Sequence, residues 1–534
     1  MKNQHKKLRQ KKMPTAYAVL GLLCASAAAL GADPYPTPAC NGSRVPPAQR
    51  RFNSSVVEAL IASYKPRFSE PNISKLFENA LPNCLDTTVT RADAAARDTF
   101  VITGDIDAMW LRDSTNQLLP YVPLAARDEE LAGLVCGAVR RQAALVLTNR
   151  YANAFNPEPS SAGHKDDAVA TKPKVPYCDG GAVFENKYEL DSLVNVLKLA
   201  NEYWNATADL SCFREEKAPP PPPRANANAS NSTWLSAVAA ILDTIAVQQA
   251  GTDEDFDDPS YTFQRTTNVA TDTLLNAGRG VPARRTGMSK SYFRPSDDAT
   301  TLPFFVPANA YAVVELRQLS AAGGVLAALA AGAGGGSEPG VAAVLSKQAA
   351  ALGAEIDAGI KEHAIVIPAA AAGAAASSAP SSPHYAYEVD GFGSYYFMDD
   401  ANVPSLLALP YLGYVAKDDP IYLATRKRVL SNLTNPWFFA GSAGEGVGGP
   451  HQGTNMVWPM SIIMRALTSD DDDEISECLA LLARTHDDTF FIHESFNRND
   501  ASKFTRRWFS WANSLFGTLI ITLARERPHL IFKE

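Results

Sequence analysis

Residues 188–204 read YELDSLVNVLKLANEYW, and this stretch decides the fold class. Its apolar residues recur every three or four positions, which is the spacing of one face of an α-helix. Alternation typical of strands is scarce, and no strand–helix–strand rhythm appears. The same helical spacing recurs in residues 56–61, 129–149, 233–249, 309–319, 341–363 and 511–524. We therefore expect an all-α protein made of helix pairs joined by long loops.

The composition of the 534-residue chain is that of an ordinary globular protein, with 46% hydrophobic and 20% charged residues. The formal net charge is −8, and six basic residues fall within the first twelve, so subtracting them leaves −14 for the remainder. An acidic body disfavours nucleic acid and anionic membranes as partners. It is compatible with a neutral ligand such as a sugar.

The N-terminus has the pattern of a secretory targeting segment. The basic residues precede an apolar run from Ala16 to Leu30, which ends in small residues. Because this run is shorter than the roughly 20 residues of a membrane-spanning helix, a cleaved signal peptide over residues 1–32 is slightly favoured over a type II signal anchor. We expect a secreted or cell-wall protein, or alternatively a Golgi or ER type II membrane protein. Residues 33–53 are expected to form a proline-rich linker, and residues 54–534 the folded domain.

Glycosylation and cysteine patterns are typical of an oxidising lumenal compartment. The N-glycosylation acceptor pattern begins at Asn41, Asn53, Asn72, Asn205, Asn228, Asn231 and Asn432. Beyond Cys24 in the apolar run, the cysteines are Cys40, Cys84, Cys136, Cys178, Cys212 and Cys478. This even set suits disulfides, although the sequence does not determine their pairing. The absence of C-x-x-C spacing disfavours a zinc site.

Three segments have the composition of surface insertions: residues 218–232, 321–340 and 368–383. Between them lie blocks rich in aromatic, acidic, glycine and asparagine residues. Helices with few chemically reactive side chains, alternating with loops that are rich in them, are typical of an α-toroid enzyme, in which loops at one end form the active site.

The first of these blocks reads TGDIDAMWLRDSTN over residues 103–116. A helix that begins near Ala108 would place Arg112 and Asp113 one turn on, next to Trp110. A carboxylate, a guanidinium and an indole can together hold a sugar, because charged groups bind its hydroxyls and the ring covers its C–H face. The alternative is a buried Arg–Asp pair that braces two helices.

Two further blocks supply carboxylates with the chemistry of an acid and a base. In FRPSDDATTL, residues 293–302, one of Asp297 and Asp298 could cap a helix while the other faces a cavity. An apolar cavity would raise the pKa of that carboxyl, as a general acid requires. Glu494 lies among apolar residues in FFIHESFN, and its alternative role is a salt bridge to Arg506 or Arg507. Two carboxylates that flank a glycosidic bond are sufficient for its hydrolysis.

The remaining blocks are loops rich in possible ligands. Residues 385–402 read YAYEVDGFGSYYFMDDAN, and a calcium loop is the main alternative here, although the spacing does not match an EF-hand. His451, in the glycine-rich stretch GPHQGTNMVW, is either part of a ligand wall or a structural histidine. No nucleophilic triad signature, phosphate-binding loop or dinucleotide fingerprint is present.

Taken in order, these motifs resemble those of glycoside hydrolase family 125, the exo-α-1,6-mannosidases, including its fungal meiotically up-regulated members. The resemblance runs from about Ser54 to Leu530 and rests on GDIDAMWLRDS, FRPSDDA, YAYEVDGFG, MDDANVPSLLALPYLGY, WPMSIIMRALTS, HESF and FSWANSLFG. It implies an (α/α) six-hairpin toroid. It also implies an inverting exo-α-mannosidase that removes terminal α-1,6-linked mannose from N-glycans or mannan, without metal or cofactor.

The resemblance also assigns roles to residues. Asp297 is implied as the general acid, with Asp298 as the next candidate, and Glu494 as the general base that activates water. The residues implied to bind or shape the site around the sugar are Trp110, Arg112, Asp113, Asp400, Asn402, His451 and Trp508. The expected partner is a mannose-containing glycan, and we expect a monomer with no nucleic acid and no membrane contact beyond a possible N-terminal anchor.

Two alternatives stay open. One is a non-catalytic glycan-binding protein of the same fold, and the other is a hydrolase for a different sugar, such as an α-glucosidase.

Overall fold

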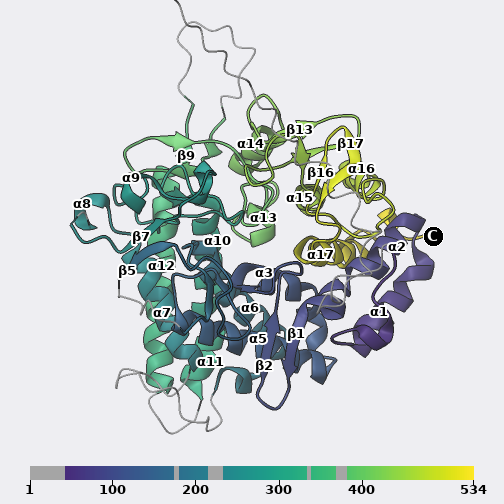
Figure 1. Cartoon of the computed structure of the whole chain (residues 1–534), viewed down its shortest axis with the longest axis horizontal. Coiled ribbons are helices and arrows are strands. Elements are labelled where there is room, and N and C mark those ends of the chain that lie inside the picture. Colours follow the sequence, from purple (N-terminus) through teal and green to yellow (C-terminus); the bar gives the residue numbers. More distant parts are fainter. Residues whose placement is uncertain are drawn as a thin grey trace, which may run out of the picture.

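Helices joined by long loops make up most of the protein (Figure 1). The computed structural model describes residues 42–172, 180–214, 233–255, 257–332, 338–368 and 382–533. The longer helices are α1 (Ser55–Tyr64), α2 (Pro71–Ala80), α3 (Leu111–Leu118), α5 (Glu129–Thr148), α6 (Leu190–Thr207), α7 (Thr233–Val247), α10 (Val306–Ser320), α11 (Val325–Ala331), α12 (Glu338–His363), α14 (Pro420–Val429), α15 (Pro459–Leu467), α16 (Asp472–Leu482) and α17 (Ser510–Glu526). The short ones are α4 (Val122–Ala125), α8 (Thr252–Asp255), α9 (Leu275–Gly278) and α13 (Leu409–Leu412).

The strands are short, and every pairing between them is antiparallel. Two-stranded ribbons pair β1 (Val89–Asp93) with β2 (Asp98–Val101), β5 (Ala168–Thr171) with β7 (Tyr261–Gln264), β9 (Ile365–Val366) with β10 (His384–Tyr385), and β13 (Phe438–Ala440) with β14 (Glu445–Val447). Three-stranded sheets join β3 (Met109–Trp110), β4 (Ala154–Phe155) and β6 (Val183–Glu185); β12 (Tyr395–Tyr396), β11 (Glu388–Val389) and β8 (Phe304–Phe305); and β15 (Met456–Val457), β16 (Ser495–Asn497) and β17 (Asp500–Thr505). These ribbons stiffen the loops that connect the helices.

Side-chain caps fix where several helices begin. Asp128 accepts a hydrogen bond from the Leu131 N–H at the start of α5. Glu70 and Asp419 cap α2 and α14 in the same way, and each is followed by a proline at the first helical position. A proline there loses no hydrogen bond, because the first N–H groups of a helix have no partner within the helix.

The central helices pack along their apolar faces into one continuous core. Helix α10 lies against both α6 and α12, α5 lies against α6 and α7, and α3 lies against α6. The face of α6 that the periodicity identifies is buried, including Leu190, Leu193, Leu197 and Ala200. Burying such side chains is the main source of stability for a protein of this size.

The two ends of the described chain meet. Helix α17 packs against α2, α3 and α15, which brings the last helix onto the first ones (Figure 1). Next to this contact, Phe68 pairs with Phe532 in a β-bridge, and the Ser69 N–H donates to the Ile531 carbonyl at 2.9 Å. The C-terminal segment therefore closes the fold against its beginning.

The helices predicted from periodicity are confirmed as α1, α5, α6, α7, α10, α12 and α17. The predicted insertion at residues 321–340 is only partly one, because α11 forms within it and buries Val325, Leu326 and Leu329. Helix α12 then begins at Glu338. The other two predicted insertions, and the predicted signal segment, lie wholly or almost wholly outside the described residues.

Residues 42–53, the end of the predicted linker, lie against the helical body. Val45 is buried, and Arg44 pairs with Asp86 at 2.9 Å and with Glu58 at 2.7 Å. The described body therefore begins before residue 54.

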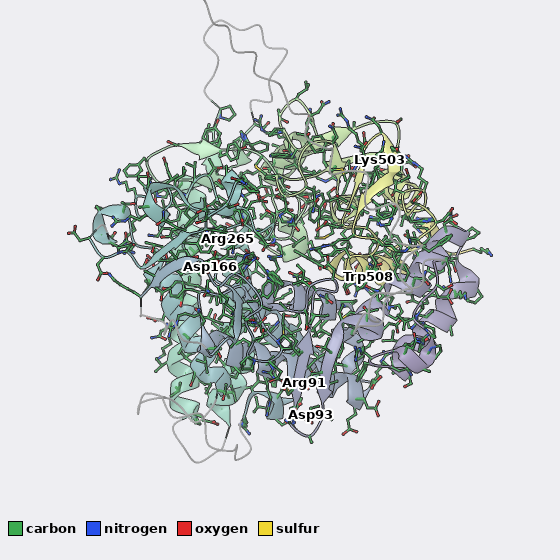
Figure 2. The ribbon with its side chains drawn as sticks, in the orientation of Figure 1. Arg91, Asp93, Asp166, Arg265, Lys503 and Trp508 are labelled. Atoms are coloured by element: carbon green, nitrogen blue, oxygen red, sulfur yellow. A yellow bond between two sulfur atoms is a disulfide. The ribbon has the colours of Figure 1, made fainter. Side chains whose placement is uncertain are left out.

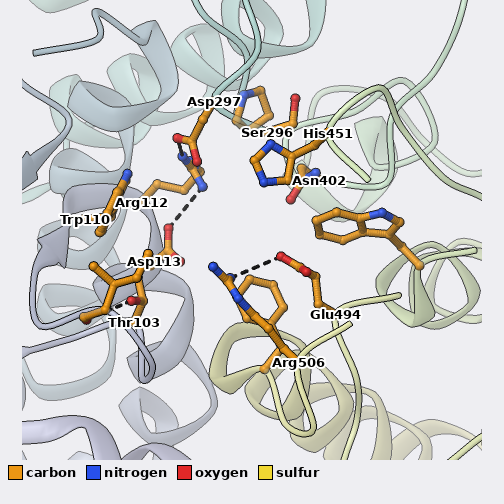
Figure 3. A pocket seen from close by; sticks show the side chains of 14 residues that line it. Thr103, Trp110, Arg112, Asp113, Ser296, Asp297, Asn402, His451, Glu494 and Arg506 are labelled. Atoms are coloured by element: carbon orange, nitrogen blue, oxygen red, sulfur yellow. Dashed lines mark hydrogen bonds and ion pairs between the residues drawn. The ribbon is translucent and has the colours of Figure 1, made fainter. Parts of the chain in front are cut away.

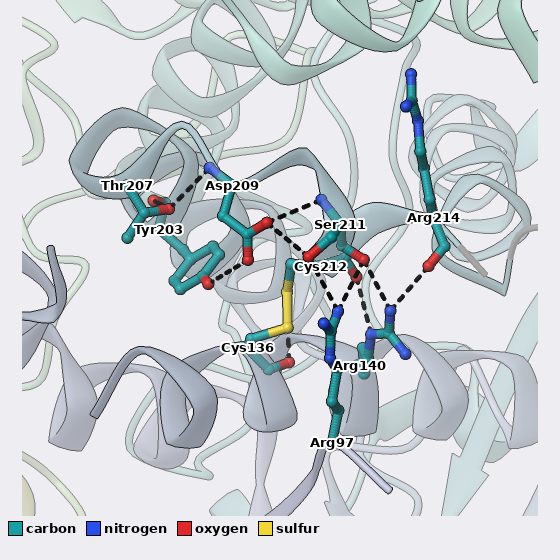
Figure 4. The surroundings of a disulfide bond; sticks show 9 residues. All are labelled: Arg97, Cys136, Arg140, Tyr203, Thr207, Asp209, Ser211, Cys212 and Arg214. Carbon is teal, nitrogen blue, oxygen red and sulfur yellow. Dashed lines mark hydrogen bonds between the residues drawn. A yellow bond between two sulfur atoms is a disulfide. The ribbon is translucent and has the colours of Figure 1, made fainter. Parts of the chain in front are cut away.

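A disulfide joins Cys136 on α5 to Cys212, 76 residues further along the chain (Figure 4). Arg140 reinforces the junction, since it donates to the carbonyl oxygens of Cys212, Ser211 and Arg214. Cys84 and Cys478 are buried free thiols, so the expectation of a fully paired set is wrong for these two. Cys24, Cys40 and Cys178 lie outside the described residues.

Within the part of the chain that the structure describes, two helical stretches are long and apolar enough to cross a membrane, judged by length and composition alone: Glu129–Thr148 and Val306–Ala331. More than half of each apolar window is buried inside the protein, as is typical of core helices.

Candidate active site

A pocket of about 380 Å³, including its open mouth, lies where loops from distant parts of the chain meet (Figure 3). Its lining residues are Thr103, Ile106, Trp110, Arg112, Asp113, Pro295, Ser296, Asp297, Asn402, His451, Trp458, Glu494, Arg506 and Phe509. All five blocks singled out in the sequence contribute to this wall. The loops that were predicted to carry chemistry therefore converge on one place.

Asp297 lies at the tip of a tight turn. The Asp297 N–H donates to the Arg294 carbonyl at 2.9 Å, and the Arg294 N–H donates to the Asp298 carbonyl at 2.8 Å. Asp297 has a φ of 68°, a left-handed conformation that costs a non-glycine residue energy. Lys187 compensates, since its ammonium donates to the Asp297 carbonyl at 2.7 Å. The turn is therefore held from both sides, and it directs the Asp297 carboxylate into the pocket (Figure 3).

Arg112 forms the centre of a buried ion cluster. Helix α3 begins at Leu111, later than the predicted start near Ala108, and Trp110 precedes it in the extended strand β3. The Arg112 guanidinium pairs with Asp297 at 2.9 Å and with Asp113 at 3.0 Å. It also reaches three more acidic oxygens, two on Glu189 at 3.3 and 3.4 Å and one on Asp191 at 3.4 Å. The alternative of a single Arg–Asp pair that braces two helices does not describe this site, because Arg112 pairs with four carboxylates.

Burial raises the pKa of several carboxyls in this cluster. The pKa of Asp113 rises to about 6, and that of Asp191 to about 7, because burial outweighs the attraction of Arg112. Burial also raises the pKa of Glu189 well above its ordinary value. Protons are therefore held in this cluster near neutral pH.

Asp297 shows the opposite shift from the one predicted. Burial alone would raise its pKa, but Arg112, and after it Lys187, lower the pKa to about 2. The sequence-based expectation of an apolar setting is wrong, because a guanidinium and an ammonium face this carboxylate. Beside these two cations, Asp297 is ionised at neutral pH.

Glu494 lies just before β16 and is almost completely buried on the opposite side of the pocket from Asp297 (Figure 3). One of its oxygens accepts from the Gln452 amide at 2.8 Å, and the other pairs with Arg506 at 3.1 Å. The salt bridge to Arg506, considered as an alternative, is therefore present. It orients the carboxylate without removing it from the pocket wall.

Asp298, the neighbour of Asp297, is buried and does not line the pocket. One of its oxygens lies 3.8 Å from His451 Nδ1 and finds no hydrogen-bond donor among the described residues. His451 does line the pocket, and its ring meets that of Trp458 edge to face. Of the two adjacent aspartates, the pocket thus exposes Asp297.

The predicted sugar-binding residues divide into two layers. Trp110, Arg112, Asp113, Asn402 and His451 line the pocket. Asp400 lies behind Asn402 and accepts hydrogen bonds from both its main-chain N–H, at 3.0 Å, and its side-chain amide, at 2.8 Å. Asp400 thus orients Asn402.

Trp508 was predicted to bind the sugar or shape the pocket around it, but its side chain does not line the pocket. It lies in the short segment between β17 and α17, near α17 in Figure 2. A Cβ atom built on Gly104 would come within 2.7 Å of its ring, so the indole packs tightly on this glycine. Its contact with the pocket is indirect, through the loop that carries Thr103 and Ile106.

The acidic block considered as a calcium loop serves local structure. Asp399 accepts from the N–H groups of Leu406 and Leu407, and Asp390 accepts from those of Phe392 and Ser394. These bonds occupy both oxygens of Asp399 and one oxygen of Asp390. Within the described ranges, no group of three or more histidine, cysteine, aspartate or glutamate side chains could hold a metal ion.

Sequence reasoning missed Gln452, Lys187 and Glu189, whereas Arg506 was named in advance as a possible partner of Glu494. Gln452 and Arg506 hold Glu494, and Lys187 and Glu189 hold Asp297 and Arg112. Glu189 and Asp191 could have been identified from the sequence, since two acids near the start of an otherwise apolar helix are expected to be buried and to need cationic or hydrogen-bonding partners.

Comparisons with known proteins agree with the motifs. A family model described as metal-independent α-mannosidase (GH125) matches residues 70–521. The meiotically up-regulated gene 157 protein of Schizosaccharomyces pombe is 42% identical over 492 residues, which covers 91% of this chain and 89% of that protein. A solved Streptococcus pneumoniae structure is 35% identical, with a TM-score of 0.76, and the match covers 89% of this chain and all of that one. It is described as a non-productive substrate complex with α-1,6-mannobiose, from a family of metal-independent α-mannosidases linked to the processing of N-linked glycans.

Proposed function

Since the chain belongs to the GH125 family of metal-independent α-mannosidases, we propose that it removes terminal α-1,6-linked mannose from N-glycans or mannan by an inverting acid–base mechanism. The observation that carries this proposal is the placement of two carboxylates, Asp297 and Glu494, on opposite sides of one pocket (Figure 3). The bacterial relative solved with α-1,6-mannobiose supports the choice of linkage.

Asp297 is the proposed general acid. Asp297 lines the pocket and Asp298 does not, which supports Asp297 as the group that reaches the oxygen of the leaving sugar. Because Arg112 holds the pKa of Asp297 low, a proton has to reach Asp297 before the glycosidic bond breaks. Asp298 is the second candidate.

Glu494 is the proposed general base. Gln452 and Arg506 fix both of its oxygens, so the carboxylate has one orientation towards the pocket. In an inverting enzyme this group removes a proton from a water molecule that attacks the anomeric carbon from the face opposite the leaving group. That mechanism requires the two carboxyl groups to be about 6.5–9.5 Å apart, which leaves room for the water.

The proposed grip on the terminal mannose comes from groups that line the pocket. Arg112, Asp113 and Asn402 offer charged and amide partners for hydroxyl groups, and His451 adds a ring nitrogen. Trp110 supplies an apolar ring for the C–H face of the sugar. Asp400 and Trp508 act one layer further out, by holding Asn402 and the Gly104 loop in place.

The proposed architecture is an (α/α) six-hairpin toroid whose loops form the active site at one end. Support comes from the mainly helical structure and from the packing of α17 onto α2 and α3, which closes the chain on itself. We also propose that residues 1–32 are a signal peptide or anchor, that residues 33–53 include a linker, and that the catalytic domain works as a monomer in the secretory pathway.

Release of free mannose tests the proposal. The purified chain should hydrolyse α-1,6-mannobiose faster than α-1,2- or α-1,3-mannobiose or α-glucosides, and EDTA should leave the rate unchanged. Asp297→Asn should remove most of the activity, and Asp298→Asn serves as the matched variant that identifies the acid. Preference for a glucoside, or binding of mannobiose without turnover, would replace the proposal with one of the two alternatives.

A further inference from the structure

One guanidinium lies among four carboxylates, some in the pocket wall and some behind it. We call Arg112, Asp113, Glu189, Asp191 and Asp297 the Arg112 cluster; in it each carboxylate has an oxygen within 3.4 Å of a guanidinium nitrogen. The side chains of Arg112, Asp113, Glu189 and Asp191 are 7% exposed or less, and that of Asp297 is 27% exposed. Water therefore screens only Asp297 to any extent.

A second cation near Asp297, Lys187, does not neutralise the excess negative charge of the Arg112 cluster. Lys187 donates to the main-chain carbonyl of Asp297 and pairs with Asp272 at 2.7 Å and with Glu185 at 3.6 Å. Buried like charges this close cannot all be ionised, so the Arg112 cluster retains at least one proton.

Position within the cluster indicates which group keeps that proton. The Glu189 side chain is fully buried, as is that of Asp191, and Glu189 accepts hydrogen bonds from Asn153 at 3.0 Å and Ser192 at 2.7 Å. Burial raises the pKa of Glu189 well above its ordinary value, whereas that of Asp297 is lowered. The two carboxyls are neighbours, since both accept from Arg112 Nη2 and Glu189 lies within hydrogen-bonding reach of Asp297.

We propose that Glu189 stores the proton that Asp297 donates, so that the two carboxyl groups share one proton beside Arg112. This inference rests on the proposed role of Asp297 as general acid. Glu189 does not line the pocket, so it is a positioning residue that acts through Asp297.

The proton balance of one turnover is complete. The Glu189 carboxyl passes its proton to Asp297, which passes it to the glycosidic oxygen as the bond from that oxygen to the anomeric carbon breaks. Water supplies a hydroxyl group to the anomeric carbon and its proton to Glu494. After the products leave, Glu494 loses a proton to solvent and the Glu189–Asp297 pair regains one, so the net reaction consumes only water.

Charged groups from every surrounding segment face this pair and set its affinity for the proton. They are Arg112 and Asp113 from α3, Asp191 from α6, Glu185 and Lys187 from β6 and the loop after it, His451 from its loop, and Arg506 from the segment after β17. Glu185 is linked to the pair only indirectly, because the Asn153 side-chain amide donates to both Glu185 and Glu189.

Glu189→Gln tests the proposal, because the amide keeps the shape of the side chain but has no acidic proton. Two substrates are compared: α-1,6-mannobiose, whose leaving oxygen needs a proton, and α-mannosyl fluoride, whose fluoride leaves without full protonation. We expect kcat on mannobiose to fall by about 100-fold or more, the usual contribution of a general acid, and kcat on the fluoride to change by less than about threefold.

The dependence of kcat/KM on pH provides a second test, because a purely structural role of Glu189 would leave the shape of that profile unchanged. Without Glu189, only Asp297 carries the proton, and Asp297 has the lower pKa. The alkaline limb of kcat/KM on mannobiose should therefore shift to lower pH. Glu315→Gln is the matched control, because Glu315 is also fully buried and pairs with Lys198 at 3.3 Å, and it should leave both substrates and the pH profile unchanged.

Each other outcome has a distinct meaning. An equal loss on both substrates, or wild-type activity on mannobiose, overturns the proposal for Glu189. Failure of the wild type to hydrolyse either substrate would instead overturn the proposed function.

If Glu189→Gln does not fold, infrared spectroscopy of the otherwise wild-type chain provides a second test. In the Glu315→Gln background with ¹³C-labelled glutamate, a protonated glutamic acid carbonyl band at pH 7 supports the proposal, and its absence overturns it.

Discussion

Replacing Arg112 by methionine removes the guanidinium that pairs with all four carboxylates of the Arg112 cluster, while it retains an unbranched apolar side chain. The oxygens that lose their partner lie 2.9–3.4 Å from the guanidinium nitrogens. Breaking a buried ion pair from one side costs about 3–5 kcal/mol, because the remaining charge stays buried. We expect a loss of that size in the free energy of unfolding at pH 7.5.

The loss should depend on pH in a defined direction. Without the cation, the folded-state pKa values of Asp113, Glu189 and Asp191 rise further above their unfolded values, and Asp297 loses the main interaction that lowers its pKa. A raised carboxyl pKa contributes stability that is present at low pH and is lost as the pH rises, at about 1.4 kcal/mol per pH unit for each extra proton bound. One extra proton would make the deficit of the variant grow by about 3 kcal/mol between pH 5 and pH 7.5.

Urea unfolding at both pH values measures this effect. Arg294→Met is the matched control, because Arg294 is equally buried and its shortest ion pair, 2.7 Å, is with Glu388. The pH-dependent part of the deficit should be larger for Arg112→Met than for the control. An Arg112→Met deficit that is the same at pH 5 and pH 7.5 would refute the reasoning, since it would show that lost packing, and not unpaired charge, causes the destabilisation.

Three further predictions concern stability. Loop-closure entropy for 76 residues predicts that replacing Cys136 and Cys212 together by alanine lowers the free energy of unfolding by up to about 4.5 kcal/mol; equal thermal stability of variant and wild type would contradict this. Burial raises the pKa of Asp399 to about 8, so its contribution to stability is lost as the pH rises from about 4 towards 8, and Asp399→Asn should gain stability relative to the wild type over that range in urea unfolding. Gly104→Ala should cost about 1–3 kcal/mol, because Gly104 has a φ of 136° and a Cβ would meet the Trp508 ring at 2.7 Å; a neutral result would show that the loop can move.

The helical part of the fold was predictable because periodicity is a local property. The apolar spacing of residues 188–204 and 341–363 predicts α6 and α12, which the structure confirms. The insertion predicted at residues 321–340 was partly wrong, because alanine and glycine content disguised the buried face of α11. The closure of α17 onto α2 could not be predicted, since it depends on contacts between the two ends of the chain.

The residues of the site that lie within recognisable sequence motifs could be predicted, but the contacts between distant segments could not. Asp297, Glu494 and Arg112 stand in recognisable stretches, and all three line the pocket. The sign of the pKa shift at Asp297 was not predictable, because the cation responsible comes from α3, 185 residues away in sequence. The same distance in sequence hid Lys187, whose contact with Asp297 spans 110 residues.

The stereochemistry of the released mannose tests the central claim most directly. Proton NMR during hydrolysis of α-1,6-mannobiose should show β-mannose first, with α-mannose appearing only as the anomers equilibrate. Glu494→Gln should abolish release, because the water then lacks its base. α-Mannose as the first product would contradict the inverting mechanism, and undiminished release by Glu494→Gln would contradict the assignment of the base.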